Sequence, residues 1–164
     1  MSRLQLAIEQ IVFARNYTTG LLDQTPTDEW FRLPPGGVSH VAWQVGHIAF
    51  SEYRLALWRI RAERPGDAAL FSPEFKRLFG ADSVPQAGSA YPPGELRAAL
   101  ARVHEQVLRE LPALHDAELD QAVPHPHPFA KTKLLALLWC AHHEMLHAGQ
   151  IGLLRRLLGY APMW

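Results

Sequence analysis

Four long segments with the periodicity of amphipathic helices dominate this chain of 164 residues, and no segment has the alternation typical of a strand. The segments cover residues 4–22, 40–64, 96–114 and 132–158. Apolar side chains recur in them at spacings of three, four and seven, which places those side chains on one face of a helix. Four long helices without strands predict an all-α protein. We expect a four-helix bundle that forms a single domain over residues 1–164.

Capping and turn residues mark where these helices should begin and end. Ser39 is expected to cap the second helix, and the Pro-Gly pair at 65–66 should end it. Pro112 should kink or end the third helix, and Gly159 should cap the C-terminus of the fourth. The long connection between the second and third helices should hold a short helix at 73–79. Its length permits a crossover between helices that are not simple up-and-down neighbours.

The composition excludes several classes of function. Charged residues make up 20% of the chain, and 16 basic residues balance 16 acidic ones. This balance predicts no partnership with nucleic acid or with an anionic membrane. The longest apolar run, residues 134–141, is far too short to span a membrane, and Glu9 and Gln10 interrupt the apolar run that a signal peptide needs. Cys140 is the only cysteine, so no internal disulfide can form, and we expect a cytoplasmic protein.

A pair of histidines in the last helix points to a metal. The stretch "AHHEMLHAGQI" at 141–151 places His143 and His147 four residues apart. Side chains at this spacing lie one above the other on a helix, so the two imidazoles can bind one ion. The pattern H-E-x-x-H is also the zinc-protease signature. However, no His, Asp or Glu follows His147, so the third ligand that those proteases use is missing.

A third ligand must therefore come from upstream, and the second helix offers candidates. His40, His47 and Arg54 lie seven residues apart on nearly the same stripe of this helix. Periodicity alone does not decide whether the stripe faces the interior or the solvent. Its aromatic neighbours Trp43 and Phe50 favour a buried stripe that lines a cleft.

The two histidine motifs, "HVAWQVGHIAFSE" and "HHEMLHAGQIGLLRRLLG", resemble those of the DinB/YfiT superfamily of metal-binding four-helix bundles. The resemblance extends over essentially the whole chain. It implies that His47, His143 and His147 bind one divalent metal ion, with open or water-filled positions remaining. It also implies a crossed bundle topology and, commonly, a homodimer. The family includes bacillithiol- and mycothiol-dependent S-transferases, and thus implies a small-molecule substrate such as a low-molecular-weight thiol.

From this resemblance we expect a metal-dependent enzyme that activates a thiol for transfer to an electrophile. Imidazole ligands suit several ions, with zinc or nickel expected first and iron as a further candidate. Two other functions stay open. One is a non-catalytic metal-binding bundle that serves stability or sensing, with Cys140 or a carboxylate closing the site. The other is a metal-dependent hydrolase with Glu144 as the general base.

Five residues are candidates to line the pocket around such a metal. Trp43 and Phe50 flank the first histidine motif. Cys140 lies one turn before the histidine pair and is a ligand, a nucleophile or an ordinary core residue. Glu144 is a base beside the metal or, as we favour, a carboxylate directed at another helix or at a ligand imidazole. Gln150, one turn after the motif, could line the open metal position.

Other polar residues have less specific patterns. His125 and His127 lie in the proline-rich stretch "PHPHP", for which we favour a surface loop over a place at the pocket mouth. His104 has no recognisable partner. Arg54 and Arg61 could hold an anionic substrate, although surface ion pairs are the more common role of such residues.

Overall fold

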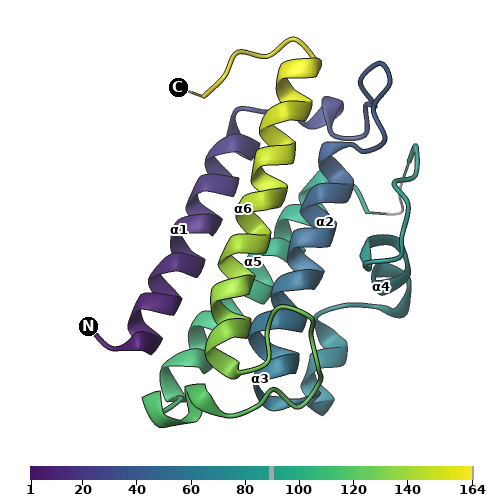
Figure 1. Ribbon diagram of the computed structural model, residues 1–164. Helices are drawn as coiled ribbons and strands as arrows, with labels where there is room; N and C mark the ends of the chain where they lie inside the picture. The colour runs from purple at the N-terminus through teal and green to yellow at the C-terminus, as the bar shows by residue number, and fades with distance from the viewer. Residues whose placement is uncertain (89–90, 164) are drawn as a thin grey trace.

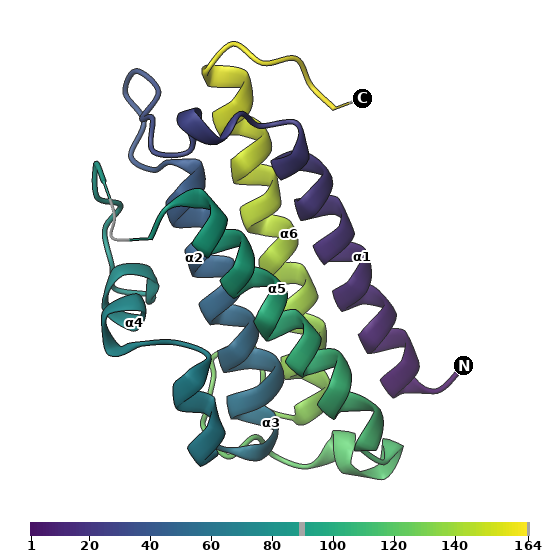
Figure 2. The same cartoon turned by 180° about the vertical axis from the view of Figure 1, so that it is seen from behind.

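All regular structure that the computed structural model describes, over residues 1–88 and 91–163, is helical, and this confirms the all-α class. Four long helices lie side by side in both views (Figure 1, Figure 2): α1 (Arg3–Asp23), α2 (Val41–Glu52), α5 (Pro93–Glu110) and α6 (Lys133–Leu157). α1 packs mainly against α6, whereas α2 packs against both α5 and α6. Within the described residues, no helix combines the length and the hydropathy that a membrane span requires.

Short helical elements connect and extend the long ones. They are η1 (Thr27–Glu29), the π-helix η2 (Tyr53–Trp58), α3 (Arg59–Arg61), η3 (Pro65–Ala69), α4 (Pro73–Phe79), η4 (Leu111–Ala113) and η5 (Asp116–Asp120). α2, η2 and α3 follow one another without a break, and the wider turns of η2 displace the side chains after Glu52 from the α-helical spacing. The predicted continuation of this helix to residue 64 is wrong. It ends at Arg61, because Ala62 adopts a φ of 63° that no α-helix accommodates.

The N-terminus of α2 also differs from the prediction. His40, not Ser39, is its N-cap, and the Nδ1 atom of this imidazole accepts the Trp43 backbone N–H at 3.1 Å. The Ser39 hydroxyl is used elsewhere, since it accepts a hydrogen bond from the Gln44 side chain. A histidine can act as a cap because an unprotonated ring nitrogen is an acceptor, as a serine hydroxyl is.

The ends of the last two long helices agree with the sequence. Gly159 has a φ of 94° and follows α6, where its N–H donates to the Arg156 carbonyl and the Tyr160 N–H donates to the Arg155 carbonyl. This pair of hydrogen bonds is a Schellman motif, which requires the left-handed conformation that glycine adopts without strain. α5 ends one residue before the 3₁₀ turn that contains Pro112.

Apolar side chains from all four long helices fill the space between them. Burial of each large aliphatic or aromatic side chain stabilises the fold by about 1.5–3 kcal/mol. The most deeply buried include Ile11, Leu22, Trp30, Ile48, Leu137 and Ile151.

One charged or titratable side chain from each long helix meets inside this core. Arg15 of α1 donates from Nε to Glu144 of α6 at 2.8 Å and from Nη2 to Glu52 of α2 at 2.7 Å. His104 of α5 lies 2.7 Å from the other oxygen of Glu52, so the prediction that it has no partner is wrong. Burial alone would raise the pKa of Glu52, but Arg15 and His104 outweigh it and hold the pKa of this carboxyl below its usual value. The four side chains thus couple all four helices.

Candidate metal centre

Packing of α2 against α6 brings His47, His143 and His147 together. One ring nitrogen from each lies within 4.8 Å of the other two. The ring centroids are 4.5 Å apart for His143 and His147, and 4.6 Å apart for His47 and His147. The pair on α6 is positioned by its spacing of one helical turn. The third imidazole depends on the tertiary structure, which turns its face of α2 toward α6.

Hydrogen bonds at the far side of two rings orient them. The Nδ1 atom of His47 lies 2.8 Å from the Phe79 carbonyl oxygen, and the Nδ1 atom of His147 lies 2.5 Å from the side-chain oxygen of Gln44. The Gln44 amide nitrogen in turn donates to the Ser39 hydroxyl at 2.8 Å. Because both acceptors are oxygens, each Nδ1 carries the proton. Each Nε2 is therefore unprotonated, and that of His47 lies 3.3 Å from the Ser51 hydroxyl, which can donate to it.

The acidity of the three imidazoles also suits a metal. Burial lowers the pKa of His47. Burial, and next the neighbouring His47, lower the pKa of His143 to about 4. Burial, and next His143, lower the pKa of His147 to about 3. All three rings are therefore neutral at neutral pH, which is the form that binds a metal. Three neutral imidazoles, two of them oriented by hydrogen bonds, fit a divalent ion such as zinc or nickel.

A close approach between helices supports this arrangement. Gly46, next to the first ligand candidate, faces α4, and a Cβ atom at this position would lie 2.3 Å from the Phe79 ring. Glycine therefore allows α4 to come near enough for the Phe79 carbonyl to reach His47. The Trp43 indole stacks on the same imidazole, with ring centroids 4.7 Å apart, and donates to the Ser83 hydroxyl.

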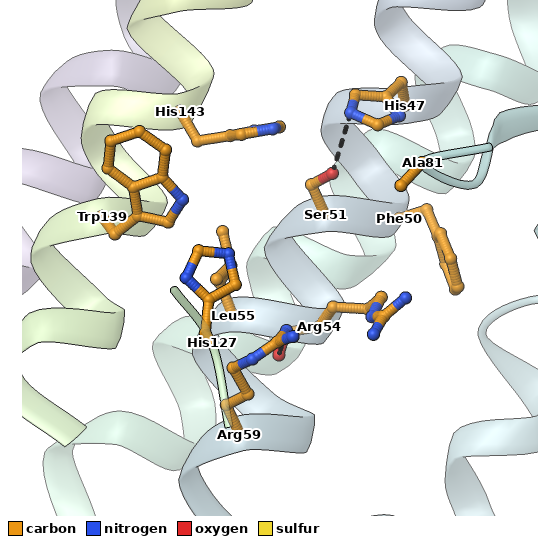
Figure 3. A pocket seen from close by; sticks show the side chains of 10 residues that line it. All are labelled: His47, Phe50, Ser51, Arg54, Leu55, Arg59, Ala81, His127, Trp139 and His143. Atoms are coloured by element: carbon orange, nitrogen blue, oxygen red, sulfur yellow. Dashed lines mark hydrogen bonds between the residues drawn. The ribbon is translucent and has the colours of Figure 1, made fainter. Parts of the chain in front are cut away.

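A cavity of ≈ 180 Å³ opens beside two of the three histidines. Figure 3 shows His47 and His143 at one end of it and Arg54, Arg59 and His127 at the other. It is lined by His47, Phe50, Ser51, Arg54, Leu55, Arg59, Ala81, His127, Trp139 and His143. The histidine cluster thus faces a space in which a small substrate could lie.

The predicted pocket residues divide into two groups. Phe50 lines the cavity, and Trp43 covers a face of the first imidazole. Glu144, Cys140 and Gln150 do not line it. The Glu144 carboxylate points to the opposite side of α6, where it pairs with Arg15, and Gln150 is exposed. Cys140 is buried, and burial raises the pKa of its thiol well above the usual value.

Several site residues were missed or misplaced by sequence reasoning. The expectation that His127 lies in a surface loop is wrong, because the loop folds back and this imidazole lines the cavity. His125 of the same loop stacks on Trp58 at 3.7 Å. His40, on the histidine stripe of α2, points away from the cluster and lies 2.7 Å from a backbone carbonyl. Gln44, which contacts the His147 ring, was not predicted as a site residue, and only its position on the same face of α2 as His47 could have indicated this role.

Arg54 and Arg61, the two arginines proposed to hold an anionic substrate, differ in their surroundings. The Arg61 guanidinium is bound by Asp67 and Glu110 and serves as a structural ion pair. Arg54 lines the cavity.

Comparison with known proteins identifies a similar fold and a family. A crystal structure of a conserved protein from Enterococcus faecalis has a similar fold, with a TM-score of 0.70 and 18% sequence identity over 96% of this chain and 97% of that chain. At this identity the likeness concerns the fold alone. No curated protein matches the sequence. Residues 10–151 match the DinB superfamily, in agreement with the two histidine motifs, and the chain therefore belongs to the DinB superfamily.

Proposed function

We propose that this protein is a metal-dependent enzyme that activates a low-molecular-weight thiol for transfer to an electrophile. The observation that supports it is a cluster of three neutral imidazoles, two of which, His47 and His143, line an open cavity. Three protein ligands leave a coordination position free, as catalytic sites do and structural sites do not. When bound there, a divalent ion would lower the pKa of a thiol that reaches it.

The chain's own residues would hold and orient the reactants. His47, His143 and His147 would hold zinc or nickel, with iron as the next candidate. Phe50 and Trp139 provide apolar walls for the electrophile. The Ser51 hydroxyl lines the cavity 3.3 Å from Nε2 of His47, where it can donate to or accept from a substrate.

The two alternative functions receive unequal support from the positions of Glu144 and Cys140. A hydrolase with Glu144 as the base is not supported, because this carboxylate is buried and pairs with Arg15 on the other side of α6. A non-catalytic metal site closed by Cys140 loses its proposed fourth ligand, since the thiol is no part of the cavity wall. A metal-binding protein without catalysis is then the remaining alternative, and the experiment below separates it from an enzyme.

The finer architecture is part of the same proposal. We assign α1, α2, α5 and α6 to a four-helix bundle of the DinB type, in which the long connection from α3 to α5 is the crossover. We further propose a homodimer. Its support is the exposure of large apolar side chains on neighbouring helices, with Phe13 of α1 59% exposed and Leu146 and Leu153 of α6 57% and 54% exposed.

Two measurements test the proposal. Elemental analysis should find about one divalent ion per chain, and His143→Ala should remove most of it, because two imidazoles hold a metal poorly. His142→Ala is the matched control, since this neighbouring histidine is exposed and outside the cluster.

The reaction is tested with the metal-loaded protein, a panel of thiols (cysteine, glutathione, mycothiol and bacillithiol) and a reactive electrophile. Thiol consumption should exceed the uncatalysed rate, and His47→Ala should return it to background. If metal is bound but no thiol reacts faster than its control, the protein is a metal-binding bundle without this activity.

A further inference from the structure

The end of the cavity away from the histidines holds two arginines without acidic partners. Arg59 is only 7% exposed, and its Nη1 donates to the Arg54 backbone carbonyl at 3.3 Å. Among the described residues, its buried Nε has no hydrogen-bond partner, and neither guanidinium pairs with a carboxylate. Figure 3 shows both side chains at the same end of the cavity, close to His127.

The other buried and half-buried arginines discussed above, and Arg155, have acidic or oxygen partners for their guanidinium groups. Arg15 binds two glutamates, Arg61 binds an aspartate and a glutamate, and Arg155 donates to two backbone carbonyls and a hydroxyl. An unpaired buried charge is costly, so folds rarely keep one without a use. Burial, together with the like charge of Arg54, lowers the pKa of Arg59, which reflects the missing anion.

An aromatic support holds the two guanidinium groups in place. The Trp58 ring centroid lies 4.9 Å from the Arg54 Cζ and 5.1 Å from the Arg59 Cζ. Trp58 itself stacks on His125, which ties it to the loop before α6. Stacking on the face of an aromatic ring leaves the N–H groups at the guanidinium edge free to donate.

A third donor completes this end of the cavity. The Nδ1 atom of His127 accepts the Phe129 backbone N–H at 3.2 Å, so the neutral ring carries its proton on Nε2. This end therefore offers donors and positive charge but, within the described lining, no carboxylate. A guanidinium matches the planar, two-oxygen geometry of a carboxylate better than that of any other common anion except phosphate.

We propose that Arg54 and Arg59 bind a carboxylate of the substrate, with the three histidines at the opposite end of the same cavity. The assignment of this carboxylate to the substrate rests on the proposed function, whereas the binding itself can be measured without metal. The cavity volume of ≈ 180 Å³ restricts the ligand to a small organic acid or to the acidic end of a longer molecule.

The test is isothermal titration of the full chain, freed of metal with a chelator, with succinate, its neutral analogue succinamide, and inorganic phosphate. Succinate should bind and succinamide should not. Loss of one charge-assisted contact in Arg54→Gln or Arg59→Gln should weaken succinate binding about tenfold or more. Arg102→Gln is the matched control, because this arginine is exposed on α5 and lies outside the cavity.

Circular dichroism of each variant separates binding from folding. If Arg59→Gln does not fold, Arg54→Gln still decides, because the Arg54 side chain is half-buried and its loss leaves no cavity in the core. Equal affinity for succinate in the wild type and the folded variants, or no binding of succinate, would overturn the proposal. Tighter binding of phosphate than of succinate would overturn the choice of a carboxylate. Succinate binding without any thiol reaction would support this subsite and contradict only the proposed function.

Discussion

Replacement of Arg15 by methionine should destabilise this protein more than most single substitutions. The guanidinium makes three hydrogen bonds to Glu52 and Glu144 and a fourth to the Leu100 carbonyl at 2.7 Å. The two carboxylates are only 2% and 3% exposed. Arg15→Met fills a similar volume but leaves both carboxylates without their cation.

Removal of one partner from a buried ion pair costs about 3–5 kcal/mol, and here one cation serves two anions. We therefore expect a loss at the upper end of this range. A loss of that size is a large part of the roughly 5–15 kcal/mol by which a domain is stable.

The loss of stability in Arg15→Met should depend on pH, in a direction that follows from the pKa of Glu52. In the wild type, the pKa of Glu52 lies below its usual value of 4.5, so its contribution to stability is present above that pH and is lost as the pH falls. Without Arg15, only His104 opposes the effect of burial, so the pKa of Glu52 should rise relative to the wild type. The variant's deficit should then be largest near neutral pH and should shrink as the pH falls and the carboxyl takes up a proton.

Urea unfolding, followed by circular dichroism, measures these free energies. The triple variant Arg15→Met, Glu52→Gln, Glu144→Met removes the charges together and should recover more than half of the loss. The exposed Arg102→Met is the control for the loss of an arginine as such. A deficit below about 1 kcal/mol, typical of an exposed ion pair, would refute the reasoning. A deficit that does not change with pH would do the same.

Gly46→Ala should lower stability by about 1–3 kcal/mol in urea unfolding and weaken metal binding at the same time, because the new Cβ would clash with the Phe79 ring and displace the carbonyl that orients a ligand imidazole; an unchanged midpoint would show that α4 yields without cost. Gln44→Leu should lower metal affinity about 10–100-fold in a competition titration with a chelator, since it removes the acceptor for a second ligand imidazole. Wild-type affinity in that variant would exclude such a role. Cys140 should react with a disulfide reagent only when the protein unfolds, because burial and two nearby carboxylates raise the pKa of its thiol. Rapid labelling of the native protein would contradict the burial.

The sequence by itself predicts the helices and the pairing of two of the three candidate ligands, because both depend on local geometry. Periodic apolar positions define the long helices to within a few residues at most ends, and α4 (Pro73–Phe79) has the predicted bounds. The proximity of His143 and His147 follows from the rise and turn of one helix alone. The resemblance of the two histidine motifs to the DinB/YfiT superfamily is confirmed by the match over residues 10–151.

The local departures were not predictable from periodicity. The π-helix at Tyr53–Trp58 shifts the side-chain positions that the α-helical spacing assigns, and it includes Arg54 at the cavity. The helix end at Ala62 depends on a left-handed backbone that the sequence gives no reason to expect of alanine.

Only the tertiary structure decided which way the polar groups on each helix point. Glu144 lies next to a ligand candidate in the sequence, yet it pairs with Arg15, 129 residues away. His47 enters the cluster because α2 turns that face toward α6, and His127 enters the cavity because its loop folds back over it. The physical reason is the same in each case. A helical wheel fixes the angles between side chains on one helix, whereas the neighbour that each face meets depends on how the apolar surfaces of all four helices are buried together.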